Sequence, residues 1–154
     1  MDHFRVAKMC VDAGPDITLV NNLVSARHQI SAVVYVRSIK GPNWYEEKSD
    51  GAVINVDRTK SLKELLAAHN AGEIHYPAQQ SIRDEIFNHL KTTKKIRERG
   101  SDGDMVERFI KTNDTDHWVH SLNYAKIAMA IMGSGFRGVV GVLPGVSRVK
   151  MKGG

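Results

Sequence analysis

The segment KMCVDAGPDITLVNNLVSARHQISAVVYVRS, residues 8–38, predicts the order strand, helix, strand. Its first part, KMCVDA (8–13), is short and apolar and ends at a Gly-Pro turn signal, as a buried strand does. Asp16 can cap a helix over 17–27, and the β-branched run AVVYVRS (32–38) is typical of a strand. Four apolar residues share one face of that helix: Ile17, Val20, Leu23 and Val24. The order implies a right-handed crossover between parallel strands, and hence the α/β class.

Further elements follow this segment along the chain. A polar loop at 41–51 leads to a third strand, AVINVD (52–57), and then to a helix that Thr59 or Ser61 could cap. The spacing by four of three apolar residues predicts a longer helix over 78–97. These residues are Ile82, Ile86 and Leu90. Glycine turn signals within RGSDGDMVERFIKTN predict a hairpin.

The last predicted helix runs from Asp116 to Met132. Its apolar residues recur at spacings of four and three, which indicates a face turned to the core. They are Trp118, Leu122, Ala125, Met129 and Met132. The Gly-rich residues 133–154 lack a strong period and are expected to form a flexible tail, which leaves 1–132 as the folded domain.

Composition describes an ordinary globular domain of 154 residues, with 42% hydrophobic and 25% charged residues. The apolar runs all fall short of the roughly 18 residues that a membrane span needs. The single cysteine, Cys10, excludes an internal disulfide and a cysteine-based zinc cluster, which fits a reducing, cytoplasmic setting. Because Cys10 falls within an apolar strand, we expect it to be a core residue rather than a nucleophile.

Positive charge is the main compositional signal, with a net charge of +5. The densest basic segment is KTTKKIRERG, and on the predicted helix three of its lysines would share one face. Its basic residues are Lys91, Lys94, Lys95, Arg97 and Arg99. The segment is either a solvated helix face or a ridge that contacts phosphates without reading sequence.

Asp12 is the acidic residue of interest near the N-terminus. It ends the first predicted strand, and open α/β sheets bind ligands at the carboxyl ends of their strands. A carboxylate there is costly unless it is exposed, hydrogen-bonded or bound to a cation. Asp12 therefore either caps the turn that follows or binds a divalent metal ion.

A second polar group opens the last helix, where Asp114 and Asp116 precede His117 and His120. One acid would be enough to cap the helix and complement its dipole, so the group is more polar than a cap requires. Mg²⁺ and Mn²⁺ prefer oxygen ligands, and nucleases often use two such ions. The spacing of the two histidines also permits a transition-metal site. The chain has no GxxxxGK[ST], HExxH or GxSxG motif, which removes the corresponding ATP, zinc-protease and hydrolase signatures.

Three segments in order resemble the C-terminal nuclease domain of tailed-bacteriophage large terminase subunits. They are KMCVDAGPD, AVINVDRTKSLKELLAAHNAGEIHYP and TDHWVHSLNYAKIA, and together they span about residues 5–132. The resemblance implies an RNase H-like fold, with a mixed sheet flanked by helices. It matches Asp12 to the second metal-binding acid of the family and Asp116 to the third.

The same resemblance assigns the neighbouring residues. Asp114 and His117 would assist the metal site, and Asp114 is an additional candidate ligand. His120 stands where many relatives have another acid, while Asp57 has a structural role. The family's first acid lies on an earlier strand, which implies a sheet that is incomplete at its N-terminal edge and an absent ATPase domain.

The implied function is two-metal cleavage of concatemeric double-stranded DNA, with Mg²⁺ or Mn²⁺, in the cytoplasm of an infected bacterium. The implied partners are duplex DNA, an upstream terminase polypeptide, the small terminase and the portal, or a second copy of the chain, and no membrane. The alternatives are a non-catalytic DNA-binding or assembly module, and another RNase H-like nuclease such as a resolvase.

Overall fold

The computed structural model describes residues 6–14, 16–48, 51–100, 103–112 and 116–133. The chain has a mixed α/β architecture and divides into two compact units. Among the described residues, one unit is built from those up to Ser61 together with 123–133, and the other from Leu62 to Leu122. Each unit is described by itself below.

The first unit contains a four-stranded sheet in the order β1-β2-β4-β3. Its strands are β1 (Met9–Asp12), β2 (Ile30–Val36), β3 (Tyr45–Lys48) and β4 (Val53–Asp57). The pairs β1–β2 and β2–β4 are parallel, as the strand–helix–strand order predicted, and β3 is antiparallel to β4. The prediction of a loop at 41–51 was wrong at β3, whose polar sequence is held in the sheet by main-chain pairing with β4.

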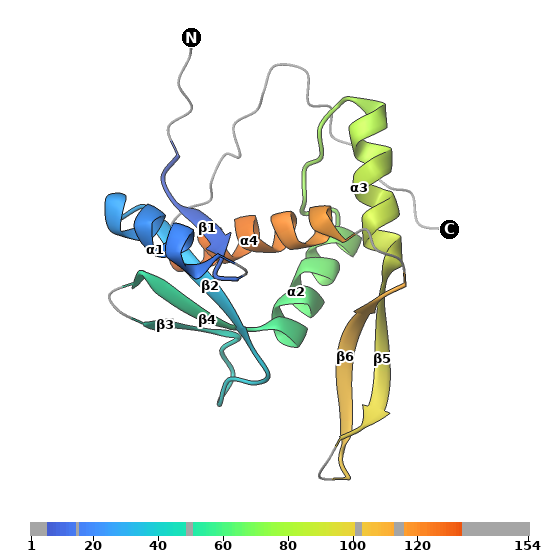
Figure 1. The fold of residues 1–154 in the computed structure, drawn as a ribbon. Helices are drawn as coiled ribbons and strands as arrows, with labels where there is room; N and C mark the ends of the chain where they lie inside the picture. Colours follow the sequence, from blue (N-terminus) through green and yellow to red (C-terminus); the bar gives the residue numbers. More distant parts are fainter. Residues whose placement is uncertain (1–5, 15, 49–50, 101–102, 113–115, 134–154) are drawn as a thin grey trace. The chain divides into compact units, whose positions relative to one another are not determined.

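Helix α1 (Ile17–Ala26) connects β1 to β2 along the chain and packs against β2 (Figure 1). The predicted cap is confirmed, since the Leu19 N–H donates to Asp16 Oδ1 at 2.9 Å. Of the four residues predicted to face the core, however, Val20 alone is buried, and Leu23 is 39% exposed. The periodicity located the helix correctly, but it overstated how much of the apolar face is covered.

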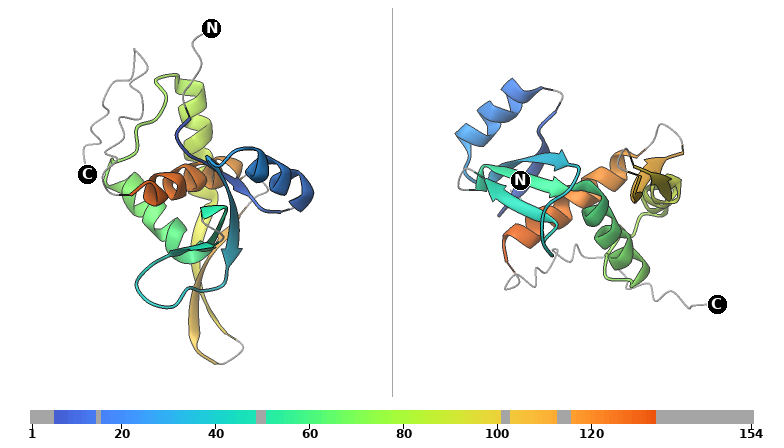
Figure 2. Two further views of the ribbon diagram at one scale, coloured as in Figure 1. Left: turned by 90° about the vertical axis from the view of Figure 1, so that its left-hand side faces the viewer. Right: turned by 90° about the horizontal axis from the view of Figure 1, so that it is seen from below.

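The opposite face of the sheet is covered by the C-terminal half of α4 (His117–Ile131), as the two views of Figure 2 show. Its Ile127 and Ala128 pack against the buried strand residues. These are Cys10, Val33, Ile54 and Val56. The core face predicted for α4 was right in part. Trp118 and Leu122 pack against the core of the second unit, but Ala125 and Met129 are exposed. The buried positions are Val119, Asn123, Ile127 and Ala128.

The second unit combines most of α2 (Arg58–Asn70), α3 (Gln80–Thr92) and the first turns of α4 with a two-stranded hairpin. The hairpin pairs β5 (Thr93–Arg99) with β6 (Met105–Lys111) in antiparallel register. An apolar core joins these elements. It contains Leu62, Leu65, Ile86, Leu90, Phe109 and Val119.

Helix α2 begins at a different cap from the one predicted. The Lys60 N–H donates to Asp57 Oδ1 at 2.9 Å, so Asp57 rather than Thr59 or Ser61 begins the helix. Ser61 is buried, and its hydroxyl donates to the Arg58 carbonyl oxygen. The bond from the Lys60 N–H to Asp57 agrees with the structural role expected for Asp57.

The helix predicted over 78–97 was too long, because α3 ends at Thr92 and the chain continues as β5. Two adjacent threonines, Thr92 and Thr93, disfavour continued helix, and pairing with β6 satisfies the backbone beyond them. The predicted hairpin is present but begins earlier than RGSDGDMVERFIKTN. Gly103 lies in its turn with φ +88°, a conformation that favours glycine.

Among the described helices, none is long and apolar enough to span a membrane. The tail predicted at 133–154 lies outside the described residues except for Gly133.

Candidate functional site

Asp12 lies at the carboxyl end of β1 with an exposed side chain. The Gly14 N–H donates to its Oδ1 atom at 3.2 Å, so Asp12 does close the turn after β1. Its register partner on β2 is Val33, a residue of the core beneath α4, which places Asp12 on the α4 side of the sheet. The turn contact leaves the carboxylate exposed, so capping and cation binding are compatible.

Tyr124 of α4 also contacts this carboxylate. Its hydroxyl is hydrogen-bonded to Asp12 and to the Tyr35 hydroxyl. The rings of Tyr35 and Tyr124 stack with their centroids 5.9 Å apart. Burial, followed by the charges of its neighbours, raises the pKa of Tyr124, and burial also raises the pKa of Tyr35. Both phenols therefore stay neutral at physiological pH and can donate a proton in a hydrogen bond.

Asn123 extends this network into the core. Its Nδ2 atom donates to the Tyr35 hydroxyl at 2.9 Å and to the Ser61 hydroxyl at 3.1 Å. The Asn123 side chain is fully buried, and its Oδ1 atom finds no hydrogen-bond donor among the described residues. A buried acceptor left unpaired costs about 1–3 kcal/mol, so the amide is not explained by stability alone.

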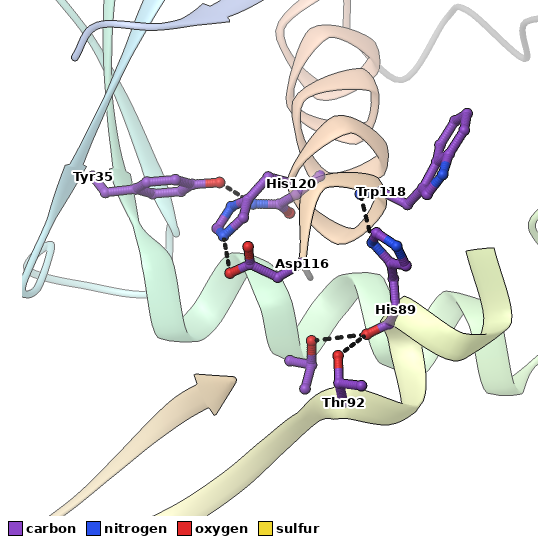
Figure 3. Close-up of polar contacts among 8 residues, drawn as sticks. Tyr35, His89, Thr92, Asp116, Trp118 and His120 are labelled. Carbon is purple, nitrogen blue, oxygen red and sulfur yellow. Dashed lines mark hydrogen bonds and ion pairs between the residues drawn. The ribbon is translucent and has the colours of Figure 1, made fainter. Parts of the chain in front are cut away.

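Asp116, which lies in the second unit, immediately precedes α4 and faces a histidine instead of the helix backbone. The Nε2 atom of His120 lies 3.2 Å from Asp116 Oδ2, one turn along the helix (Figure 3). Both side chains are largely buried. The Asp116 side chain therefore pairs with His120, and among the described residues it does not cap the helix.

The first turn of α4 is capped from another helix. The Trp118 N–H donates to Nδ1 of His89, on α3, at 3.4 Å (Figure 3). This contact requires an unprotonated Nδ1 on His89. The ring of His117 lies near that of His89, with their centroids 6.4 Å apart.

The predicted metal ligands belong to different units. Asp12 belongs to the first unit and Asp116 to the second, and Asp114 lies outside the described residues. Throughout the described ranges, no three His, Cys, Asp or Glu side chains come together as a metal-binding group.

The basic residues predicted on one helix face lie on two elements. Lys91 is in the last turn of α3, whereas Lys94, Lys95, Arg97 and Arg99 belong to β5. The prediction of a helical ridge was wrong, because the chain changes from period 3.6 to period 2 at Thr93. On a strand, Lys95, Arg97 and Arg99 share one face and Lys94 lies on the other.

The hairpin itself is strongly basic. Its two strands carry six basic and two acidic residues, an excess of four positive charges. Glu107 pairs with Arg97 at 2.8 Å and with Lys95 at 3.4 Å, and these contacts hold the pKa of Glu107 below its usual value. Arg99 lies on the same face, opposite Met105. The hairpin is an exposed, positively charged two-stranded ribbon.

Sequence reasoning missed Tyr35, Tyr124, Asn123 and Ser61. A signal was present for Asn123, since it stands four residues from both Val119 and Ile127 and interrupts their apolar stripe. Cys10, expected in the core, is buried, and its burial raises the pKa of the thiol to about 11. That shift keeps the thiol protonated, as befits a core residue.

Comparison with known proteins adds no relative: no family model matches, and neither curated proteins nor solved structures gave a match.

Proposed function

We propose that this chain is part of a metal-dependent DNA endonuclease of the terminase nuclease type, with an RNase H-like arrangement of its sheet. The observation that carries the proposal is Asp12. It is an exposed carboxylate at the carboxyl end of a parallel strand, and a buried polar network contacts it from α4. Ligands of open α/β sheets bind at this edge. The ordered resemblance of three sequence segments supports the same assignment.

The donor chemistry at Asp12 fits one ligand of Mg²⁺ or Mn²⁺, since both prefer carboxylate oxygen. When bound, such an ion can activate water and stabilise the leaving oxygen of a phosphodiester. Asp12 would hold the ion, Gly14 would orient one carboxylate oxygen, and Tyr124 would orient the carboxylate from the α4 side. Asp116, with His120 beside it, is the second proposed acid.

The remaining ligands would come from a partner. β1 is an edge strand of the described sheet, and Met9 and Ala13 direct their N–H groups to β2. The N–H groups of Cys10 and Asp12 consequently point away from β2, because successive residues alternate along a strand. A strand from an upstream terminase polypeptide, or from a second copy, could pair there and bring its own acid next to Asp12.

The β5–β6 hairpin would hold the substrate. A two-stranded ribbon fits the major groove of duplex DNA, and lysine and arginine contacts to phosphate bind without sequence preference. Concatemeric DNA in the infected bacterial cytoplasm is the proposed substrate, and the small terminase and portal are the proposed assembly partners.

The proposal is tested by nicking of supercoiled plasmid in Mn²⁺, by the chain alone and with an upstream terminase polypeptide. We expect cleavage to fall at least about a hundredfold in Asp12→Asn and Asp116→Asn, because removing an essential metal ligand removes transition-state stabilisation. Glu64→Gln, an exposed acid on α2, is the matched control and should cut like the wild type. Equal cleavage by the wild type and Asp12→Asn would contradict the assignment.

A second candidate is a DNA-binding or assembly module without catalysis. The concentration of positive charge on the hairpin favours it, because that surface does not depend on a metal site. Such a module would bind duplex DNA with steep salt dependence and equally well in Mn²⁺ or EDTA. A preference for branched over linear duplex would instead favour a resolvase-type nuclease.

A further inference from the structure

A chain of four side chains leads from the core of the first unit to Asp12. Ser61 and Asn123 are fully buried, Tyr35 and Tyr124 are partly buried, and Asp12 is exposed. The links run from Ser61 to Asn123, from Asn123 to Tyr35, from Tyr35 to Tyr124, and from Tyr124 to Asp12. The residues come from α2, α4, β2 and β1, so the network connects elements that are distant in sequence.

The direction of its first hydrogen bonds is fixed by chemistry. The Ser61 hydroxyl donates its one proton to the Arg58 carbonyl, at 3.1 Å, and that oxygen can do nothing but accept. Ser61 must then accept from Asn123, which places Nδ2 of the amide toward both hydroxyls. A flipped amide would set two acceptors, Oδ1 and the Ser61 oxygen, against each other.

The remaining bonds follow from this orientation. Tyr35 accepts from Asn123 and donates its own proton to the Tyr124 oxygen, because the single Tyr124 proton is used for the bond to Asp12. Tyr124 then donates its proton to the Asp12 carboxylate, which accepts when it is ionised. From Asn123 onward, each donor points toward Asp12, and one arrangement of protons satisfies the whole chain.

We infer that Asn123, Tyr35 and Tyr124 are positioning residues that hold the Asp12 carboxylate in the orientation that binds a divalent cation. This inference rests on the proposed metal-binding role of Asp12. Outer groups that donate to a ligating carboxylate fix its orientation and typically change metal affinity by about 10–100-fold when they are lost.

Two observations separate this role from simple support of the fold. An exposed carboxylate is hydrated by water and does not need a buried network to satisfy it. Asn123 meanwhile leaves its own Oδ1 buried without a donor among the described residues, where an apolar side chain would avoid that cost. The amide is accounted for by the Nδ2 bonds that orient Tyr35.

The test is titration of the ¹⁵N-labelled chain with Mn²⁺, following paramagnetic broadening of the Gly14 amide, whose N–H donates to Asp12. Compared with the wild type, Tyr124→Phe should need about 10–100-fold more Mn²⁺ for the same broadening. Asn123→Leu should move the midpoint in the same direction by a smaller factor, and it introduces no new unpaired polar group of its own. Amide spectra without Mn²⁺ verify that each variant is folded.

Tyr45→Phe is the matched control. Its hydroxyl likewise joins a strand to α4, by donating to the Ala130 carbonyl oxygen at 3.3 Å, but it does not contact Asp12. We expect the wild-type midpoint for this variant. A midpoint shift as large in Tyr45→Phe as in Tyr124→Phe would mean that any lost contact between sheet and helix weakens the site, and would overturn the inference.

The titration also separates the two levels of the argument. If the Gly14 amide of the wild type is not broadened, or Asp12→Asn broadens equally, Asp12 is not a ligand and both proposals fall. If Asp12→Asn abolishes broadening while Tyr124→Phe and Asn123→Leu behave as wild type, the metal role stands and the positioning role is wrong.

Discussion

The two units of this protein differ in where they keep their polar groups. The core of the first unit includes four buried polar residues, Ser31, Asp57, Ser61 and Asn123. In the described part of the second unit, His89 is the single buried polar residue, beside a core of aliphatic and aromatic side chains. The second unit instead carries its charge on the exposed β5–β6 hairpin.

This difference bears on the two proposed sites. Orienting one carboxylate needs rigid, directional hydrogen bonds, which are strongest where water is excluded. Contacting phosphates needs charge rather than direction, and an exposed ribbon provides it without desolvation. The interior of the first unit suits a site of defined geometry, and the hairpin of the second suits non-specific attraction.

The largest expected effect concerns packing, where the two units should behave alike. Ile54 and Ile86 are both almost fully buried, one in each core. We expect Ile54→Ala and Ile86→Ala each to lower the free energy of unfolding by about 2–5 kcal/mol. Urea unfolding followed by tryptophan fluorescence measures this, with Val34→Ala, at a half-exposed site, as a control expected to cost much less. A small effect in one unit would show that its core is loosely packed.

Under the proposed function, the hairpin should dominate attraction to DNA. Replacing Lys95, Arg97 and Arg99 with glutamate should weaken duplex binding and lower the slope of log K against log salt by about 3, since each phosphate contact contributes about 0.9. A control with the same change of charge replaces Lys8, Arg27 and Lys40 in the first unit. Fluorescence anisotropy measured from about 50 to about 300 mM salt distinguishes the two triple variants by their slopes. Equal losses in both triple variants would mean that net charge, and not the hairpin, drives binding.

Helix starts provide a smaller contrast between the units. Asp16 accepts a backbone N–H of α1, whereas the Asp116 carboxylate contacts the His120 ring. Asp16→Ala should therefore cost about 1 kcal/mol of stability. Asp116→Ala should cost about 0.5 kcal/mol, from the helix dipole and the lost contact with His120. Thermal or urea unfolding of the two variants tests this, and an equal or greater loss in Asp116→Ala would contradict the expected order of the two helix starts.

The smallest effect is a pH dependence in the second unit. Burial lowers the pKa of His69 below its ordinary 6.5, and its Nδ1 atom lies 2.8 Å from the Tyr76 hydroxyl. Above pH 6.5 His69 is neutral in both states and costs no stability. As the pH falls below 6.5, the unfolded chain binds a proton more tightly than the folded chain does, so the folded state loses stability. Between about pH 7.5 and about pH 5, the range over which histidine titrates, we expect His69→Gln to lose less stability than the wild type. Identical pH profiles for the variant and the wild type would exclude His69 as its source.

Local sequence signals determined much of the first unit. The β-branched run of β2 and the apolar run of β1 predicted parallel strands, and Asp16 predicted the start of α1, because propensity and capping act over a few residues. The same reasoning marked Asp12, since an acid that ends a buried strand is conspicuous. It failed at β3 and β5, whose polar, charged sequences are strands because a neighbouring strand pairs with them.

The sequence by itself thus determined the α/β class, the parallel β1–β2 pairing, the capped α1 and the position of Asp12 at a strand end. Tertiary structure decided which face of α4 is buried and that the basic residues belong to a hairpin. It also brought Tyr35, Asn123 and Tyr124 to Asp12 from separate elements. Periodicity places Asn123 in the stripe of Val119 and Ile127, but only long-range packing shows what its amide contacts, because the two partners of Nδ2 lie 62 and 88 residues away.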